Sequence, residues 1–197
     1  MRKYKISPKL NPNNIFLVNN SELESRLDPH FYKPEFRILQ NKLESKPNSK
    51  LGNLIYFSNE TWNQKDFFDD QFPYIEISSI NTTSGDIKDI SYISKSEAPS
   101  RAKKIVREND IIVSTTRPNR GAISFIKKEY DFHIASTGFS VLRNLKTESI
   151  SKEFLYLILH QATSLKQMEQ RCSGGNYPAI TEDELRKIII PTLDKKK

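Results

Sequence analysis

Cysteine is nearly absent from this sequence, in which Cys172 is the one cysteine among 197 residues. An intramolecular disulfide is therefore impossible, which is typical of proteins from a reducing compartment. Histidine is also scarce, with three residues far apart in the sequence. A tetrahedral zinc site needs several cysteine and histidine ligands at close spacing. These absences predict a chain without disulfides and without a bound metal.

Long apolar runs are absent as well. No stretch approaches the roughly 20 apolar residues that cross a bilayer. The basic segment 1–5 is not followed by the apolar core of a signal peptide,. We therefore expect a soluble, cytoplasmic protein with no membrane partner.

The sequence also lacks the signatures of common catalytic sites. It has no Gly-x-Ser-x-Gly nucleophile turn, no Gly-x-x-x-x-Gly-Lys-Ser/Thr phosphate loop and no glycine-rich turn between a strand and a helix,. Asp69, Asp70 and Glu76 resemble the acids of a metal-dependent nuclease. However, Ser78 stands where the usual carboxylate-x-Lys pattern has its lysine. These absences predict that the chain is not an enzyme and needs no cofactor.

Positive charge is the main feature of the composition. The chain has 31 Lys and Arg against 24 Asp and Glu, a net charge of +7 and a pI near 9.3. Such a balance favours nucleic acid as the partner over an acidic membrane surface or an acidic protein. With 36% hydrophobic residues, the chain also has enough apolar side chains to bury a core.

Hydrophobic spacing and turn residues predict many short strands with a helix near each end. One helix falls within 21–46, with Pro34 in its first turn. A clearer helix spans 151–168, and a capping box at 181–184 begins a short one,. Strands are expected at 15–18, 51–57, 73–77, 87–90, 111–114, 122–126, within 133–141 and at 188–190. This order predicts an α+β fold, in which a single domain has a mixed β-sheet flanked by helices.

The most informative segment runs from 110 to 123. A short apolar strand leads into a polar, basic turn, and a second strand leaves it. Arginine makes bidentate pairs with guanine, asparagine pairs with adenine, and hydroxyl groups bind phosphates or base edges. A solvated hairpin loop is the competing interpretation, and arginines that contact only phosphates are another. The candidate DNA-binding residues here are Ser114, Thr115, Thr116, Arg117, Asn119 and Arg120.

Three further groups are weaker candidates. A basic run between 95 and 107 suits phosphates, and the segment 62–65 offers amides suited to adenine beside Trp62, which we expect in the core. The region 127–137 adds lysines and hydroxyls near the turn if neighbouring strands pair. Each group is also compatible with a solvated polar face. Their candidates are Arg101, Lys103, Lys104, Asn63, Gln64, Lys65, Lys127, Lys128, Ser136 and Thr137, followed by Arg171 and Asn176.

Four segments, taken in order, resemble a known family. They are Ser25-Arg-Leu-Asp-Pro-His-Phe-Tyr32 with Pro34 and Phe36; Pro73-Tyr-Ile75 with Gly85-Asp-Ile87; Asn109-Asp-Ile-Ile-Val-Ser114 with Gly121; and Gly174-Gly-Asn-Tyr-Pro-Ala-Ile180 with Leu185 and Ile188-Ile-Ile-Pro191. Each is degenerate alone, but their order and spacing are fairly specific. The chain resembles a target recognition domain of the specificity subunit of type I restriction-modification systems, or the related domain of some type II enzymes.

The resemblance implies a fold and a role. The fold is a strongly twisted mixed sheet, or partial barrel, within one recognition domain at 21–191, with an N-terminal extension at 1–20 and a basic tail at 192–197. Such a domain reads one half of a split double-stranded DNA target. A partner adenine methyltransferase modifies the site, and a restriction subunit cuts unmodified DNA. Arg26 and Asp28 belong to the first motif, and we expect them to form a structural ion pair rather than to read bases.

The chain departs from the full pattern of the family. It has one recognition domain rather than two, and no long spacer helix follows Pro191. This favours a half-subunit or a fragment, which would pair with a second recognition domain or a homodimer mate. Two other functions stay open from sequence. One is a decoy that binds the methyltransferase without reading DNA, and the other is a small nuclease with an unfamiliar site.

Overall fold

The computed structural model of the protein describes residues 6–63 and 68–192. Its α-helices are α1 (Pro34–Glu44), α2 (Leu51–Leu54), α3 (Lys152–Leu159), α4 (Ala162–Arg171) and α5 (Glu182–Leu185). Its strands are β1 (Asn48–Lys50), β2 (Ile55–Ser58), β3 (Gln71–Ile75), β4 (Ser91–Ser94), β5 (Ala102–Ile105), β6 (Ile111–Ser114), β7 (Ile123–Phe125), β8 (Ile134–Ser136), β9 (Phe139–Leu145) and β10 (Ile189–Pro191). Short 3-10 turns include η2 (Ile77–Ser79) and η4 (Pro118–Arg120).

The strands form two four-stranded sheets and a ribbon. One sheet has the order β2-β9-β6-β7, the other β4-β3-β8-β5, and β1 pairs with β10. The pairing of β3 with β8 is parallel, whereas the other strand pairs are antiparallel. The predicted α+β domain with mixed, twisted sheet structure and flanking helices is thus confirmed. The strands divide between two sheets rather than forming one.

Side-chain alternation along β6 explains how the layers stack. Ile111 and Val113 point into a cluster with the helices, which contribute Leu155 and Met168 among others. Ile112 between them points the other way, into a cluster that includes Ile75 from the second sheet. Because successive side chains of a strand face opposite sides, one apolar strand serves both layers. The first sheet is therefore buried on both faces.

The helix predicted at 151–168 is two helices. It breaks at His160 and Gln161, and Gln161 has an extended ψ of 145°. At the break the Ser164 hydroxyl donates to the carbonyl of Ile158 at 2.7 Å, and the His160 ring bonds the carbonyl of Ile123 at 3.1 Å. The Ser164 bond satisfies a carbonyl that the interrupted helix leaves open, and the His160 bond joins the break to β7. The break lets α3 and α4 cover different parts of the core.

Three predicted strands differ from the structure. The segment 15–18 has no regular structure: Ile15 and Leu17 are exposed, Phe16 and Val18 are only half-buried, and none of them pairs with a strand in the described part of the chain. The segment 51–57 begins with the helical turn α2, which buries both Leu51 and Leu54, before β2 starts. The hairpin partner of β3 is β4, four residues later than predicted, because 87–90 contributes only an isolated bridge between Ile80 and Ile87.

Three local predictions agree with the structure. Pro34 is the first residue of α1, and Thr181 caps α5 by accepting the N–H of Glu184. Trp62 is buried, and its indole N–H donates to the carbonyl of Ala102 at 2.7 Å. Within the described part of the chain no helix is long and apolar enough to span a membrane.

Candidate nucleic-acid interface

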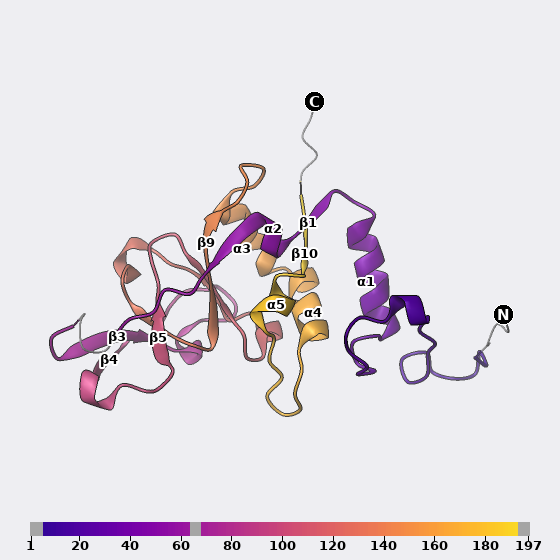
Figure 1. Cartoon of the computed structure of the whole chain (residues 1–197), viewed down its shortest axis with the longest axis horizontal. Coiled ribbons are helices and arrows are strands. Elements are labelled where there is room, and N and C mark those ends of the chain that lie inside the picture. Colours follow the sequence, from indigo (N-terminus) through magenta and orange to yellow (C-terminus); the bar gives the residue numbers. More distant parts are fainter. Residues whose placement is uncertain (1–5, 64–67, 193–197) are drawn as a thin grey trace.

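Strand directions bring four loops to one end of the two sheets, and hydrogen bonds to Thr115 and Arg117 bring a fifth loop there. Strands β3, β6 and β8 end there, while β5, β7 and β9 begin there, as their registers require. The loops are 76–85, 98–101, 115–122, 137–138 and 172–180, and we call this region the loop end. In Figure 1 the 172–180 loop, between α4 and α5, projects on the side away from β1, β10 and the marked C-terminus. The predicted turn therefore sits among other loops rather than alone.

Direct contacts join the loops of this end. The Thr115 N–H donates to the carbonyl of Gly138 at 2.7 Å, and the Thr137 N–H donates to that of Arg101 at 2.8 Å. The Ile180 N–H donates to the carbonyl of Thr115 at 2.8 Å. Gly121 has a φ of 77°, which glycine adopts easily, and a side chain there would lie 3.2 Å from the carbonyl oxygen of Thr82,. Backbone contacts thus give the loop end a defined shape.

Arg117 occupies an unusual backbone conformation at the tip of the turn. Its φ and ψ are 48° and 50°, in the left-handed region that side-chain-bearing residues avoid,. Pro118 follows it, and its ring is buried. Non-glycine residues in this region are strained and cluster at functional sites. The conformation turns the Arg117 side chain toward the 172–180 loop.

The Arg117 side chain contacts that loop closely. Its guanidinium carbon lies 4.4 Å from the ring centroid of Tyr177, and Nη2 donates to the carbonyl of Asn176 at 2.7 Å. The Arg117 N–H donates to the carbonyl of Pro178 at 2.8 Å. From sequence, Asn176 is a weak candidate and Tyr177, a residue that is 72% exposed, is not a candidate at all. The signal available in the sequence is the aromatic residue two positions after a Gly-Gly pair.

The hydroxyl groups of the turn mostly bond within the protein. The Ser114 side chain is fully buried and donates to the carbonyl of Thr116 at 2.8 Å. Thr115 Oγ1 donates to the carbonyl of Gly138 at 3.0 Å. Ser136 is 3% exposed, and its hydroxyl accepts the N–H of Gly138. These groups build the loop end, whereas Thr137 is exposed on it.

The basic candidates divide into exposed and bound groups. Arg101, Lys103 and Arg120 are exposed, as is Asn119 beside Arg120. Lys104 on β5 is half-buried, and its ammonium group lies 2.9 Å from the Glu182 carboxylate. The exposed members therefore offer positive charge at or beside the loop end that no acidic group of residues 6–63 and 68–192 neutralises by an ion pair, while Lys104 holds α5 against the sheet.

Lys127 and Lys128 lie away from the turn. The prediction placed them beside it if neighbouring strands paired, but β7 and β8 belong to different sheets. Both lysines follow the far end of β7, and Lys127 lies 3.7 Å from the Asp86 carboxylate. The expected proximity holds for Ser136 and Thr137 and is wrong for the two lysines.

The remaining sequence candidates lie elsewhere. Asn63 is exposed beyond Trp62. Gln64 and Lys65 lie outside the described residues. Arg171 is 8% exposed and forms ion pairs with Glu24 and Glu184.

Arg26 and Asp28 form the predicted ion pair, with Nε 2.5 Å from Oδ1. The hydrogen bond to Asp28 raises the pKa of Arg26, and burial opposes it. The same guanidinium donates to the carbonyls of Arg171 at 3.2 Å and Cys172 at 2.9 Å. It thus satisfies open carbonyls at the C-terminus of α4, where a positive charge is also favourable. The pair anchors the base of the 172–180 loop.

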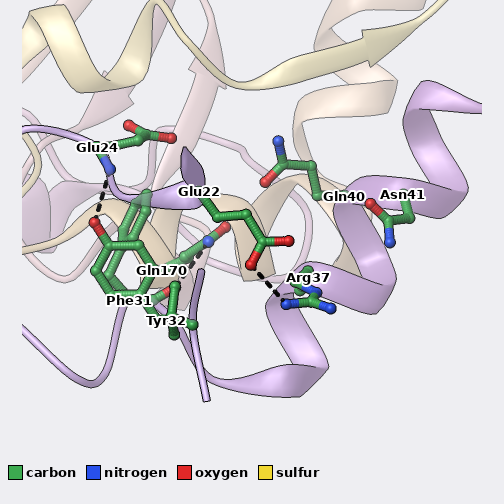
Figure 2. A pocket seen from close by; sticks show the side chains of 9 residues that line it. Glu22, Glu24, Phe31, Tyr32, Arg37, Gln40, Asn41 and Gln170 are labelled. Carbon is green, nitrogen blue, oxygen red and sulfur yellow. Dashed lines mark hydrogen bonds and ion pairs between the residues drawn. The ribbon is translucent and has the colours of Figure 1, made fainter. Parts of the chain in front are cut away.

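A pocket away from the loop end is lined by the N-terminal segment, α1 and α4. Figure 2 shows Arg37 of α1 bonded to Glu22, the N–H of Glu24 bonded to the Tyr32 hydroxyl, and Gln170 bonded to Phe31. Its charged groups are thus paired within the protein. Among the described residues no group of three or more His, Cys, Asp or Glu side chains is placed to hold a metal ion. The loop end remains the candidate interface.

Comparisons with known proteins point to one family of DNA specificity domains. The type I restriction-modification DNA specificity domain model matches residues 42–196. The specificity subunit of the type I restriction enzyme HindI from Haemophilus influenzae is 28% identical over 135 residues, which cover 68% of this chain and 26% of that subunit.

Two solved structures have a similar fold. One comes from work on complex assembly and conformational transition of the type I R-M system, with a TM-score of 0.66, and the other is the HsdS subunit of Thermoanaerobacter tengcongensis, with a TM-score of 0.63. Both are 31% identical to this chain, cover 75% of it, and are matched over 37% and 38% of their own lengths. The chain thus spans about a quarter of the Haemophilus subunit and under two fifths of either solved chain.

These findings confirm the resemblance drawn from the four motifs. The family consists of DNA specificity domains, which have no catalytic activity of their own, in agreement with the prediction that the chain is not an enzyme. Since the family model covers most of the sequence, the chain belongs to the type I restriction-modification DNA specificity domain family.

Proposed function

We propose that this domain reads one half of a bipartite double-stranded DNA target through the loop end. The observation that carries the proposal is the convergence of Arg101, Arg117 and Arg120 on loops joined by backbone hydrogen bonds. Loops with a fixed shape can hold the domain at one position along the duplex, and guanidinium groups can bind either phosphates or the edge of guanine. The exposed Thr137 and Asn119 add groups suited to phosphates and adenine.

The domain would direct two partner activities. In this proposal it binds, through the rest of its specificity subunit or a second recognition domain, an adenine methyltransferase subunit and through it a restriction subunit. The domain supplies the sequence information, and its partners carry out the chemistry. Membership of the specificity-domain family supports this division of roles.

Selection from a randomised duplex library tests the proposal. The purified chain is mixed with the library at physiological salt, and recovered duplexes are sequenced. We expect enrichment of one short motif of roughly 3–5 base pairs, with affinity that falls steeply as salt rises. Binding without enrichment would reduce the loop end to a phosphate-contacting surface, and absence of binding to DNA would favour the decoy function.

A charge-matched pair of variants locates the surface. Arg117→Glu with Arg120→Glu should abolish binding to the enriched duplex. Lys42→Glu with Lys46→Glu changes the net charge equally, at exposed residues on and just after α1, and should reduce binding much less. Equal losses would show that only the total charge matters, which contradicts a localised interface.

A further inference from the structure

The 172–180 loop holds the Arg117 guanidinium in place, whereas it does not hold the side chain of Arg120 on the same turn. Asn176 accepts a hydrogen bond from Nη2, Pro178 accepts one from the Arg117 N–H, and the Tyr177 ring covers one face of the guanidinium. Three successive residues thus hold the side chain and the main chain of one arginine. Arg120, on the same turn, is exposed, and its side chain makes no hydrogen bond or ion pair within the described residues.

The contacts leave a usable edge on the guanidinium. Nε, Nη1 and the second hydrogen of Nη2 have no protein partner among the described residues. A guanidinium presents parallel N–H groups in one plane, and guanine presents N7 and O6 as a matching pair of acceptors in the major groove. Stacking covers a face of the group and leaves this edge open. Tyr177 is itself 72% exposed, so the stacked pair lies at the surface.

Fixing a long side chain before binding favours base reading over phosphate binding. An ordered arginine loses less conformational freedom when it pairs with a base, and its fork has a set direction. A phosphate is also bound well by lysine, a point charge without a fork, so phosphate binding needs such order less, and it carries no sequence information. The backbone of Arg117 is in a strained conformation, and such conformations cluster at functional sites,.

We propose that the stacked Arg117 reads one guanine of the half-site through N7 and O6, with Tyr177 as its positioning residue. This inference rests on the proposed function, since it requires a duplex that the domain prefers. It specifies which base is read (guanine), through which atoms (N7 and O6), and which side chain positions the arginine (Tyr177). Arg120 then contributes charge without discrimination.

Replacing guanine by 7-deazaguanine removes the N7 acceptor and keeps the base pair. Each guanine of the duplex selected by the chain is replaced in turn, and dissociation constants are measured. For the unaltered chain we expect a loss of roughly tenfold at one guanine. Arg117→Lys keeps the charge and loses the fork, so it should discriminate between the modified and the unmodified duplex much less than the unaltered chain does.

Tyr177 variants test its positioning role. Tyr177→Phe keeps the aromatic face and should keep the discrimination, whereas Tyr177→Ala should lose most of it. Tyr56→Ala is the matched control, because Tyr56 on β2 is 56% exposed and has the Lys146 ammonium 4.7 Å from its ring centroid, near the other end of β9. This control should discriminate as the unaltered chain does. Thermal unfolding of each variant verifies that it is folded.

The outcomes separate the inference from the function. A chain that selects a duplex but tolerates 7-deazaguanine at every position overturns the inference and leaves the function standing. Full discrimination by Tyr177→Ala overturns the role of Tyr177. Failure to select any duplex overturns the proposed function, and the inference with it.

Discussion

Arg143 donates from Nη2 to the carboxylate of Asp110 at 2.9 Å, and the Asp110 side chain is completely buried. Asp110 also accepts Arg143 Nε at 3.0 Å and the N–H of Arg107 at 2.8 Å. Burial raises the pKa of Asp110, and the hydrogen bonds from Arg143 oppose that rise. The pair joins the start of β6 to β9, so it braces the strand that ends at the loop end.

Removing Arg143 should strongly destabilise the domain. Arg143→Met leaves the buried Asp110 carboxylate without its cation, a change that costs about 3–5 kcal/mol. Urea unfolding of the variant at neutral pH measures this free energy. Adding Asp110→Asn removes the unpaired charge and should recover a large part of the loss. A single variant that loses less than about 1 kcal/mol would show that Asp110 is not held as a buried charge.

Glu60 should make stability depend on pH in the acidic range. Its carboxylate accepts hydrogen bonds from Arg107 and Arg143, and the Arg107 bond is the largest cause of its lowered pKa. A carboxyl group with a lowered folded pKa stabilises the fold above its unfolded value near 4.5, and this contribution disappears as pH falls through the folded value,.

The comparison with Glu60→Gln isolates this contribution. Asp110 has a raised pKa and acts with the opposite sign, but it is present in both proteins. The difference in unfolding free energy should be constant well above the unfolded value and shrink as pH falls below it toward the lowered folded pKa,. Urea unfolding across this range measures it, and a difference that does not change with pH would contradict the ion pairs of Glu60.

Local patterns predicted much of the fold. The apolar run at 111–113 correctly predicted strand β6, and Pro34 correctly predicted the start of α1. Both signals are local: consecutive apolar residues suit a strand buried on both faces, and the fixed φ of proline suits the first turn of a helix. The break at His160 was not predictable in this way. It depends on Ile123, a residue 37 positions earlier that meets the His160 ring only in the folded chain.

The candidate site was likewise predictable where it depends on local sequence and not where it depends on contacts between distant residues. Sequence reasoning selected Arg117, but its partner Tyr177 lies 60 positions later in another loop. Ser114 and Ser136 were selected because hydroxyl groups can bind DNA. In the structure both hydroxyls instead form hydrogen bonds with the backbone of the loops. Residue type predicts what a side chain can bind, and only tertiary contacts determine whether it is available.

Cys172 should be unreactive in the folded protein. Burial raises the pKa of its thiol to about 11, and the residue is 8% exposed. At about pH 8 the reactive thiolate should be roughly 100-fold scarcer than in the unfolded chain. An uncharged thiol reagent should therefore label the chain slowly in buffer and quickly in urea, with Cys172→Ser as the unlabelled control. Equal rates in both conditions would show that the C-terminal end of α4 opens readily.

Arg120 should contribute to DNA affinity without contributing to specificity. Removing one cation from a phosphate reduces the slope of log affinity against log salt by about 0.9. If Arg120 binds a phosphate of the proposed target, Arg120→Ala should lower the slope by about this amount and weaken selected and unselected duplexes by the same factor. Lys128→Ala removes an exposed charge beyond the far end of β7 and should leave the slope unchanged. A preferential effect of Arg120→Ala on the selected duplex would instead make Arg120 a residue that contributes to specificity, which contradicts this prediction.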